Sequence, residues 1–200
     1  MSISTATTPS TELNLHPRVL EILAKRGYSG EMLKEFLSWD LKGLNELTQL
    51  KDLAKASERI IKAIDNKEKI GVYGDYDVDG TTSCALLYFF FELLNIEIET
   101  IQPSRFVEGY GIHASSIDEA ISRDVKVLIT VDCGISNNEA ADYALERSLD
   151  LIITDHHKDA REEMPKAYAV INPNRRDESN PKLKALAGVG VAFARALQIK

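Results

Sequence analysis

The chain has 200 residues, of which 44% are hydrophobic and 28% are charged, a composition typical of a water-soluble globular protein with one core and a small appendage. Its net charge of −7 argues against binding nucleic acid through bulk positive charge, although divalent ions at an acidic site would reverse the local field. No apolar run is long enough to span a bilayer, the first residues lack the pattern of a signal peptide, and the two cysteines suit a reducing compartment. We therefore expect a cytoplasmic protein outside the membrane.

The N-terminal quarter of the chain carries helical patterns. Residues 1–14 are rich in Ser and Thr and are expected to form a disordered leader. Residues 15–24, 30–37 and 50–64 have apolar side chains at helical spacing. We interpret residues 15–65 as a helical lead-in that packs on the following domain, because about 50 residues bury too little surface to be stable alone.

From residue 69 onwards, apolar runs alternate with helical segments. The runs that read as strands are residues 69–73, 96–101, 125–131, 149–154 and 168–171. This alternation predicts an α/β domain over residues 66–200, with a mostly parallel sheet and helices on both faces. Helix 81–94 is apolar nearly all round, so we expect it to be buried on several sides, with its aromatic triplet 89–91 in the core.

Three acidic residues follow the first of these strands. Asp75, Asp77 and Asp79 alternate with other residues, so in extended chain their side chains could converge on one spot. Such close carboxylates repel and raise one another's pKa, and a bound cation removes that cost. Oxygen ligands of this kind suit Mg²⁺ or Mn²⁺. The alternative is a solvated acidic turn that caps the next helix.

Two further strands also end in polar side chains. Asp132 follows strand 125–131, and residues 155–157, Asp-His-His, follow strand 149–154. In an open α/β sheet, ligands bind outside the carboxyl ends of the strands. The repetition favours one shared metal site over independent solvated turns.

Five motifs carry a family resemblance. They are DYDVDGTT at 75–82, RFVEGYG at 105–111, VDCG at 131–134, DHH at 155–157 and AGVGVAF at 187–193. In this order and spacing the chain resembles the DHH phosphoesterases and, within them, the RecJ-type single-stranded-DNA-specific exonucleases. Residues 15–64 also resemble the helical lead-in of RecJ proteins.

The resemblance implies a site with two metal ions for phosphodiester hydrolysis. It implies Asp132 as the bridging ligand, Asp77 and Asp79 as terminal ligands, Asp75 as a ligand or outer acceptor, and His156 as a ligand. This mixture of carboxylate and imidazole favours Mn²⁺, with Mg²⁺ as the alternative.

Other residues are candidates for contacts with the substrate. If the backbone stays extended, His157 points away from His156, so we place His157 on the scissile phosphate or as a proton donor. Asp155 is expected to orient a histidine or to cap the next turn rather than to bind metal. Arg105 could hold a phosphate or be an exposed loop residue. Gly188 and Gly190 could bind phosphate at a helix start or allow close packing. Weaker candidates for contacts with a DNA tail are Lys158, Arg175 and Arg176.

Three functions are compatible with these features. The resemblance implies a metal-dependent 5′–3′ exonuclease on single-stranded DNA in recombination and repair, working with single-strand binding protein and a helicase. The alternatives are a DHH phosphoesterase on oligonucleotides, cyclic dinucleotides or pyrophosphate, and a non-catalytic scaffold with the same fold. The motifs EGYG and AGVGVAF favour the first function, and the intact ligand set argues against the scaffold.

The last residues read as a helix in progress. RecJ proteins continue into a strand with a further aspartate ligand and then into a second domain. We therefore expect residues 1–200 to be an N-terminal piece of a larger enzyme, with weak Mn²⁺ binding and little exonuclease activity alone.

Overall fold

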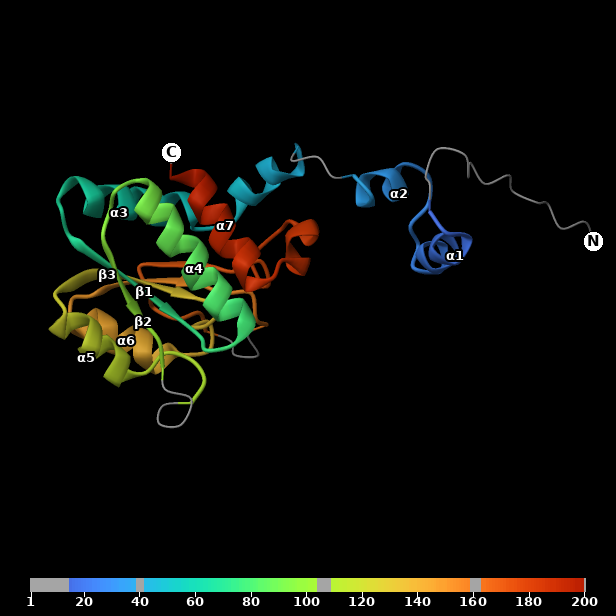
Figure 1. The fold of residues 1–200 in the computed structure, drawn as a ribbon. Coiled ribbons are helices and arrows are strands. Elements are labelled where there is room, and N and C mark those ends of the chain that lie inside the picture. Colours follow the sequence, from blue (N-terminus) through green and yellow to red (C-terminus); the bar gives the residue numbers. More distant parts are fainter. Residues whose placement is uncertain (1–14, 39–41, 104–108, 159–162, 200) are drawn as a thin grey trace, which may run out of the picture. The chain divides into compact units, whose positions relative to one another are not determined.

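The computed structural model describes residues 15–38, 42–103, 109–158 and 163–199 (Figure 1). Contacts divide the chain into two units, Met1–Lys42 and Gly43–Lys200. The expected leader and Arg105 lie outside the described residues.

The described part of the smaller unit contains the two helices that the apolar spacing predicted. α1 (Pro17–Lys25) starts with a proline, and the side chain of His16 accepts a hydrogen bond from the backbone N–H of Arg18. α2 (Gly30–Phe36) follows a turn in which Gly27 has a φ of 88°, a conformation that glycine adopts without strain.

The larger unit alternates strands and helices from residue 69 onwards. Its helical elements are the 3₁₀ helix η1 (Lys42–Gln49), which begins at the boundary, α3 (Leu53–Asp65), α4 (Val78–Leu93), α5 (Ala114–Ser122), α6 (Asn138–Glu146), the 3₁₀ helix η2 (Pro181–Ala185) and α7 (Gly188–Gln198). Its strands are β1 (Lys69–Gly74), β2 (Ile98–Ile101), β3 (Val125–Val131), β4 (Asp150–Thr154) and β5 (Ala169–Ile171).

The strands pair in parallel in the order β2-β1-β3-β4-β5. Because β1 pairs with β2 on one side and with β3 on the other, the chain reverses its direction of winding at β1. In open α/β sheets this switch point is where ligands bind, outside the carboxyl ends of the strands. The sheet therefore confirms the predicted fold class and places the ends of β1 and β3 side by side.

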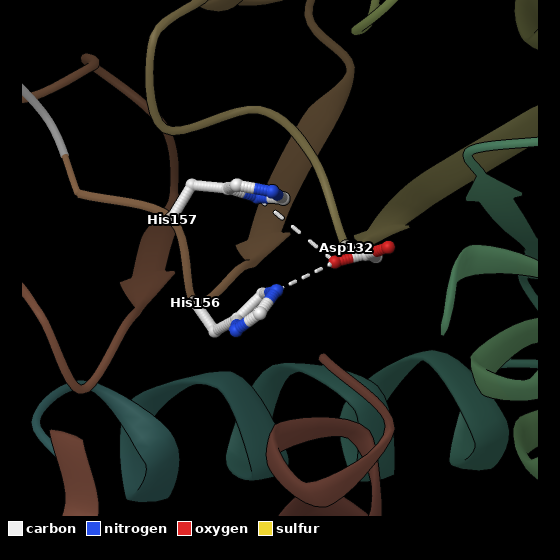
Figure 2. A group of neighbouring side chains, drawn as sticks. All are labelled: Asp132, His156 and His157. Carbon is white, nitrogen blue, oxygen red and sulfur yellow. Dashed lines mark ion pairs between the residues drawn. The ribbon is translucent and has the colours of Figure 1, made fainter. Parts of the chain in front are cut away.

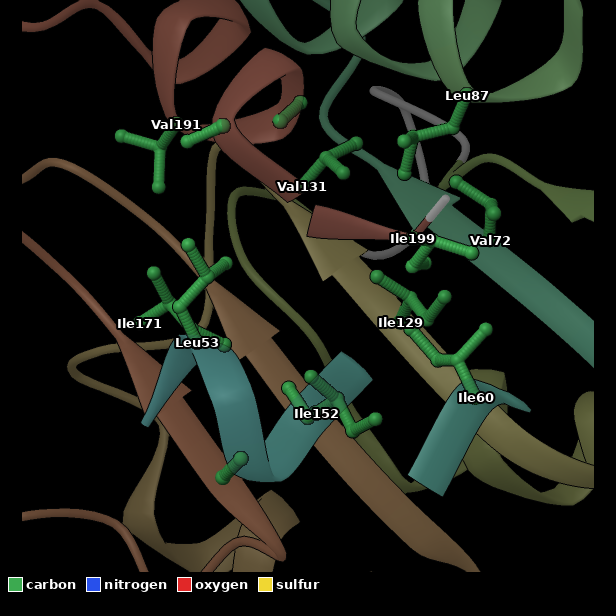
Figure 3. Close-up of a cluster of buried hydrophobic side chains, with 14 of the residues drawn as sticks. Leu53, Ile60, Val72, Leu87, Ile129, Val131, Ile152, Ile171, Val191 and Ile199 are labelled. Carbon is green, nitrogen blue, oxygen red and sulfur yellow. The ribbon is translucent and has the colours of Figure 1, made fainter. Parts of the chain in front are cut away.

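Helices cover both faces of the sheet, with α3, α4 and α7 on one face and α5 and α6 on the other (Figure 1). Consecutive strand residues serve opposite faces, so that Val72 packs toward the first group of helices and Tyr73 toward the second. Figure 3 shows Val72 and Ile129 of the sheet in one buried cluster with Ile60 of α3. These two cores hold the strand ends in place.

The segment that we interpreted as one lead-in is divided between the two units. Leu53, Ile60 and Ala63 of α3 are fully buried against the sheet, as expected of a packed helix. Because of this packing, α3 belongs to the larger unit. The boundary between the two units lies between Lys42 and Gly43.

The expectation that α4 is buried on several sides, with its whole aromatic triplet in the core, is wrong. Leu87 and Phe91 are fully buried, whereas Phe89 is 59% and Leu93 82% exposed. Consecutive side chains on a helix point about 100° apart, so residues 89–91 cannot all face the sheet. Although α4 is strongly apolar, no helix in the described residues is long and apolar enough to cross a membrane.

Candidate metal centre

Polar residues gather at the carboxyl ends of three neighbouring strands. Asp75 follows β1, Asp132 follows β3, and residues 155–157 follow β4. Because these strands are adjacent in the sheet, the convergence expected of Asp132 and the residues after β4 is present. Asp132, His156 and His157 each offer one ligand atom, and these atoms lie within 4.8 Å of one another.

Asp132 occupies the centre of this group. Its backbone has a φ of 61°, a left-handed conformation that aspartate tolerates better than most residues, and its N–H donates to the carbonyl oxygen of Thr154 at 2.9 Å. The side chain is 1% exposed. Burial, together with the charges of Asp79 and Asp77, raises the pKa of Asp132 to about 8. A carboxyl group in this environment is stabilised when it binds either a proton or a cation.

The two histidines point toward Asp132 together (Figure 2). The expectation that they diverge is wrong, because the chain does not stay extended after β4. The backbone N–H groups of His156 and His157 both donate to Oδ1 of Asp155, at 2.6 and 3.0 Å, which curls the chain into a turn. The ring centroids consequently lie 4.6 Å apart.

His156 presents its Nε2 atom to the acidic residues. Its Nδ1 lies 3.0 Å from the carbonyl oxygen of Leu186, which can only accept, so Nδ1 carries the proton. In the neutral ring, Nε2 then holds the lone pair, 3.1 Å from Oδ1 of Asp132 and 3.5 Å from Oδ2 of Asp79. A histidine whose second nitrogen donates to a carbonyl is the usual arrangement of an imidazole metal ligand.

His157 is held by Asp155, as the sequence suggested. The distance from Nδ1 of His157 to Oδ1 of Asp155 is 2.8 Å, and Oδ2 accepts the N–H of Ile135 at 2.9 Å. Burial alone would raise the pKa of Asp155, but these hydrogen bonds bring it below its ordinary value. The hydrogen bond to Asp155 raises the pKa of His157, although burial opposes the rise.

The three acidic residues after β1 make different contacts. Asp75 is buried, and burial raises its pKa. Asp77 caps α4 by accepting the N–H of Gly80 at 2.9 Å, as the alternative interpretation expected. Asp79 accepts the N–H groups of residues 188 and 189 at the start of α7, each at 2.7 Å.

The donor set fits a divalent cation. Oδ1 of Asp75 and Oδ1 of Asp132 are buried and accept no hydrogen bond within the described part of the chain. Each such oxygen is costly without a positive charge nearby, because buried acceptors need partners, and Oδ1 of Asp132 also lies 3.1 Å from Nε2 of His156. Carboxylate and imidazole together suit Mn²⁺. The metal-ligand roles expected for Asp75, Asp77, Asp79, Asp132 and His156 stay predictions.

The two glycines of the AGVGVAF motif have different surroundings. A Cβ on Gly188 would lie 2.6 Å from Oδ1 of Asp132, so only glycine lets α7 start this close to the site. A Cβ on Gly190 would meet a side-chain carbon of Leu186 at 3.2 Å, which is a packing contact. Their expected contacts with phosphate stay predictions.

The substitution Gly188→Ala is expected to weaken Mn²⁺ binding at least tenfold, because the new methyl group must displace the carboxylate of Asp132 or the start of α7. Calorimetric titration with Mn²⁺ measures the effect. Gly190→Ala is the matched control, since the side chain of Leu186 can move aside. Equal affinity in the two variants would contradict this role of Gly188.

The weaker candidates for DNA contacts differ in their exposure and in their contacts with acidic residues. Lys158 and Arg176 are exposed. The guanidinium group of Arg175 instead bonds Asp52 at 2.9 Å and Asp177 at 2.6 Å. It therefore ties the loop after β5 to the start of α3.

Sequence reasoning assigned no role to Tyr110. Its hydroxyl lies 3.1 Å from Nδ1 of His157 and 3.4 Å from the carbonyl oxygen of Asp132. Gly111 follows it with a φ of 86°, and the carbonyl oxygen of Gly111 accepts the hydroxyl of Tyr73 at 2.8 Å. Burial raises the pKa of Tyr110, which keeps the hydroxyl protonated. Its place in the RFVEGYG motif was the available signal.

Comparisons with known proteins agree with the motifs. The family model for "DHH family, N-terminal domain" matches residues 69–199. The chain is 37% identical to the single-stranded-DNA-specific exonuclease RecJ of Bacillus subtilis (strain 168), over 92% of this chain and 23% of that protein. It is 36% identical to RecJ of Escherichia coli (strain K12), over 93% of this chain and 32% of that protein.

A solved structure of exonuclease RecJ bound to manganese matches with a TM-score of 0.66 and 31% identity, over 75% of this chain and 37% of that one. These matches confirm the predicted resemblance and fold. The chain spans 23% and 32% of the length of the two curated relatives.

Proposed function

This chain belongs to the DHH family, and from that membership we propose that its protein hydrolyses phosphodiester bonds as a metal-dependent 5′–3′ exonuclease on single-stranded DNA. The observation that carries the proposal is the convergence of Asp132, His156 and His157 on one point at the switch of the sheet. The likeness to RecJ exonucleases supports the choice of substrate over small phosphoesters.

The residues around Asp132 would hold two Mn²⁺ or Mg²⁺ ions. We assign Asp132 to both ions, with the terminal ligands Asp77, Asp79 and His156, and Asp75 as a ligand or outer acceptor. When bound, the ions lower the pKa of a water molecule and stabilise the leaving oxygen. The buried oxygens of Asp75 and Asp132 support this assignment, because they accept no hydrogen bond from the described residues.

His157 would act on the substrate. Its bond to Asp155 fixes the ring and raises its pKa, so the ring retains a proton toward neutral pH. A protonated imidazole at this edge can bind a phosphate oxygen or donate its proton to the leaving oxygen. Tyr110, whose hydroxyl contacts the same ring, would limit its rotation. Arg105 is proposed to bind a backbone phosphate.

The cellular setting is also a proposal. Cys84 and Cys133 are both free and buried, which supports a reducing cytoplasm. We place the activity in DNA recombination and repair, with single-strand binding protein and a helicase as partners, on the strength of the RecJ likeness.

Digestion of end-labelled DNA tests the function. The natural protein that contains this chain is expected to degrade long single strands from the 5′ end only when Mn²⁺ or Mg²⁺ is present, and to leave duplex DNA intact. Dinucleotides, cyclic dinucleotides and pyrophosphate serve as competing substrates. Faster turnover of one of these than of long strands, or digestion in excess chelator, would contradict the proposal.

A further inference from the structure

Two asparagines in the loop after β5 contact the backbone of the two histidines. Nδ2 of Asn172 donates to the carbonyl oxygen of His157 at 2.9 Å, and Nδ2 of Asn174 donates to that of His156 at 2.6 Å. The two asparagines are joined to each other, because Oδ1 of Asn172 accepts the N–H of Asn174 at 2.7 Å. The sequence pattern had indicated no role for either asparagine.

Together with Asp155, the asparagines bind every backbone polar group of the two histidines. Asp155 accepts both N–H groups, and the asparagines donate to both carbonyl oxygens. The N–H and C=O groups of both histidines therefore have hydrogen-bond partners within the protein. The backbone conformation of the turn sets the direction of each Cα–Cβ bond and hence the side from which each imidazole ring extends. In both histidines the backbone N–H and C=O groups are held by hydrogen bonds.

The loop itself is anchored to the sheet. Asn172 directly follows β5, is 1% exposed, and is preceded by Ile171, whose carbonyl oxygen accepts the N–H of Asp155 at 3.0 Å. The amide of Asn174 also lies 3.5 Å from the carbonyl oxygen of Lys184, close to the segment that receives Nδ1 of His156. The asparagines thus connect the end of β5 to the turn at His156 and His157 through hydrogen bonds.

We propose that Asn172 and Asn174 are positioning residues that hold the turn at His156 and His157 so that both imidazoles face Asp132. This inference rests on the proposed function, since it assumes that the group binds metal. In the described structure the two asparagines bond to the histidine backbone and not to the rings or to Asp132, so they act through the peptide groups. Removing such an outer partner of a metal ligand typically costs 10- to 100-fold in metal affinity.

The test compares Asn174→Ala and Asn174→Asp with Asn66→Ala. Asn174→Asp keeps the shape of the side chain but sets an acceptor against the carbonyl oxygen of His156. Asn66 is a matched control, because its Nδ2 also makes a side-chain hydrogen bond, to Glu68 at 3.2 Å, on an exposed loop. Asn174 is partly exposed and lies outside the sheet, so both variants are expected to fold.

We expect both Asn174 variants to bind Mn²⁺ at least tenfold more weakly, as measured from the signal of free Mn²⁺ in electron paramagnetic resonance. In the metal-free variants, ¹⁵N spectra of the imidazoles should show that His156 no longer holds its proton on Nδ1. The melting temperature should fall by only about 2–4 °C, the effect of one hydrogen bond. Asn66→Ala should match the wild type in affinity and spectrum.

Wild-type Mn²⁺ affinity and an unchanged His156 spectrum in the Asn174 variants would overturn the inference. Failure of the proposed function gives a different result, in which the wild type binds Mn²⁺ and the variants lose it, but no protein digests single-stranded DNA. If the function holds and the positioning role fails, the Asn174 variants digest DNA at the wild-type rate.

Discussion

Replacing Asp132 by asparagine is expected to stabilise the metal-free protein and to abolish the proposed phosphodiesterase activity. Asparagine keeps the size of the side chain and adopts a φ of 61° readily, whereas alanine would add backbone strain. The substitution removes a buried carboxylate that stands near Asp77 and Asp79, which raise its pKa. Removal of this charge is therefore expected to raise the stability of the metal-free protein.

The gain in stability should depend on pH in one direction. The pKa of Asp132 is about 8 in the folded protein, against an ordinary value of 3.8, so the folded state holds this proton more tightly than the unfolded chain. The contribution of Asp132 to the stability of the metal-free wild type therefore falls as the pH rises from about 4 to about 8. Over that window the advantage of Asp132→Asn should grow to at most about 5 kcal/mol. Urea unfolding in chelator at pH 4.5 and pH 8 measures the difference.

Addition of Mn²⁺ should reverse the order of stability, because a metal that binds only the folded wild type stabilises it by mass action. An advantage of Asp132→Asn that is the same at both pH values would contradict the burial of an ionising carboxylate. Activity of the variant within tenfold of wild type, about 1.4 kcal/mol in the barrier, would contradict the bridging role.

The sequence was sufficient to predict that Asp132 and the two histidines come together at the strand ends. Apolar β-branched runs of strand length mark β1, β3 and β4, and a polar residue follows each of them. Parallel pairing then brings their carboxyl ends to one edge, whatever the details of the loops. Asp132 can therefore be identified from hydrophobic periodicity and the order of the elements along the chain.

Contacts between distant segments could not be predicted in the same way. The turn at His156 contacts Asn174 and Leu186, which lie beyond β5 in the chain, and β5 pairs with β4. A capping-box pattern such as the one at residues 116–119 does not mark a helix start here, because Ser116 is buried within α5, which begins at Ala114.

The substitution His156→Gln is expected to remove most Mn²⁺ affinity, whereas His157→Gln should mainly lower the rate of the proposed phosphodiester hydrolysis. Nε2 of His156 lies 3.1 Å from Oδ1 of Asp132 and has its lone pair free, because Nδ1 donates to the carbonyl oxygen of Leu186. Nδ1 of His157 lies 4.0 Å from the same oxygen and is engaged by Asp155. This geometry favours the proposed roles, with His156 as a metal ligand and His157 at the substrate.

A pH profile separates the two roles further. The pKa of His157 is raised by its bond to Asp155, so its proton is present at low pH and is lost as the pH rises through the folded pKa. If His157 donates that proton, the wild-type rate should fall along this limb, and the limb should be missing in His157→Gln. His16→Gln is the control variant, because it also removes an imidazole, from an exposed histidine that caps α1. Equal loss of Mn²⁺ affinity in the two site variants would show that both rings bind metal, which their common approach to Asp132 permits.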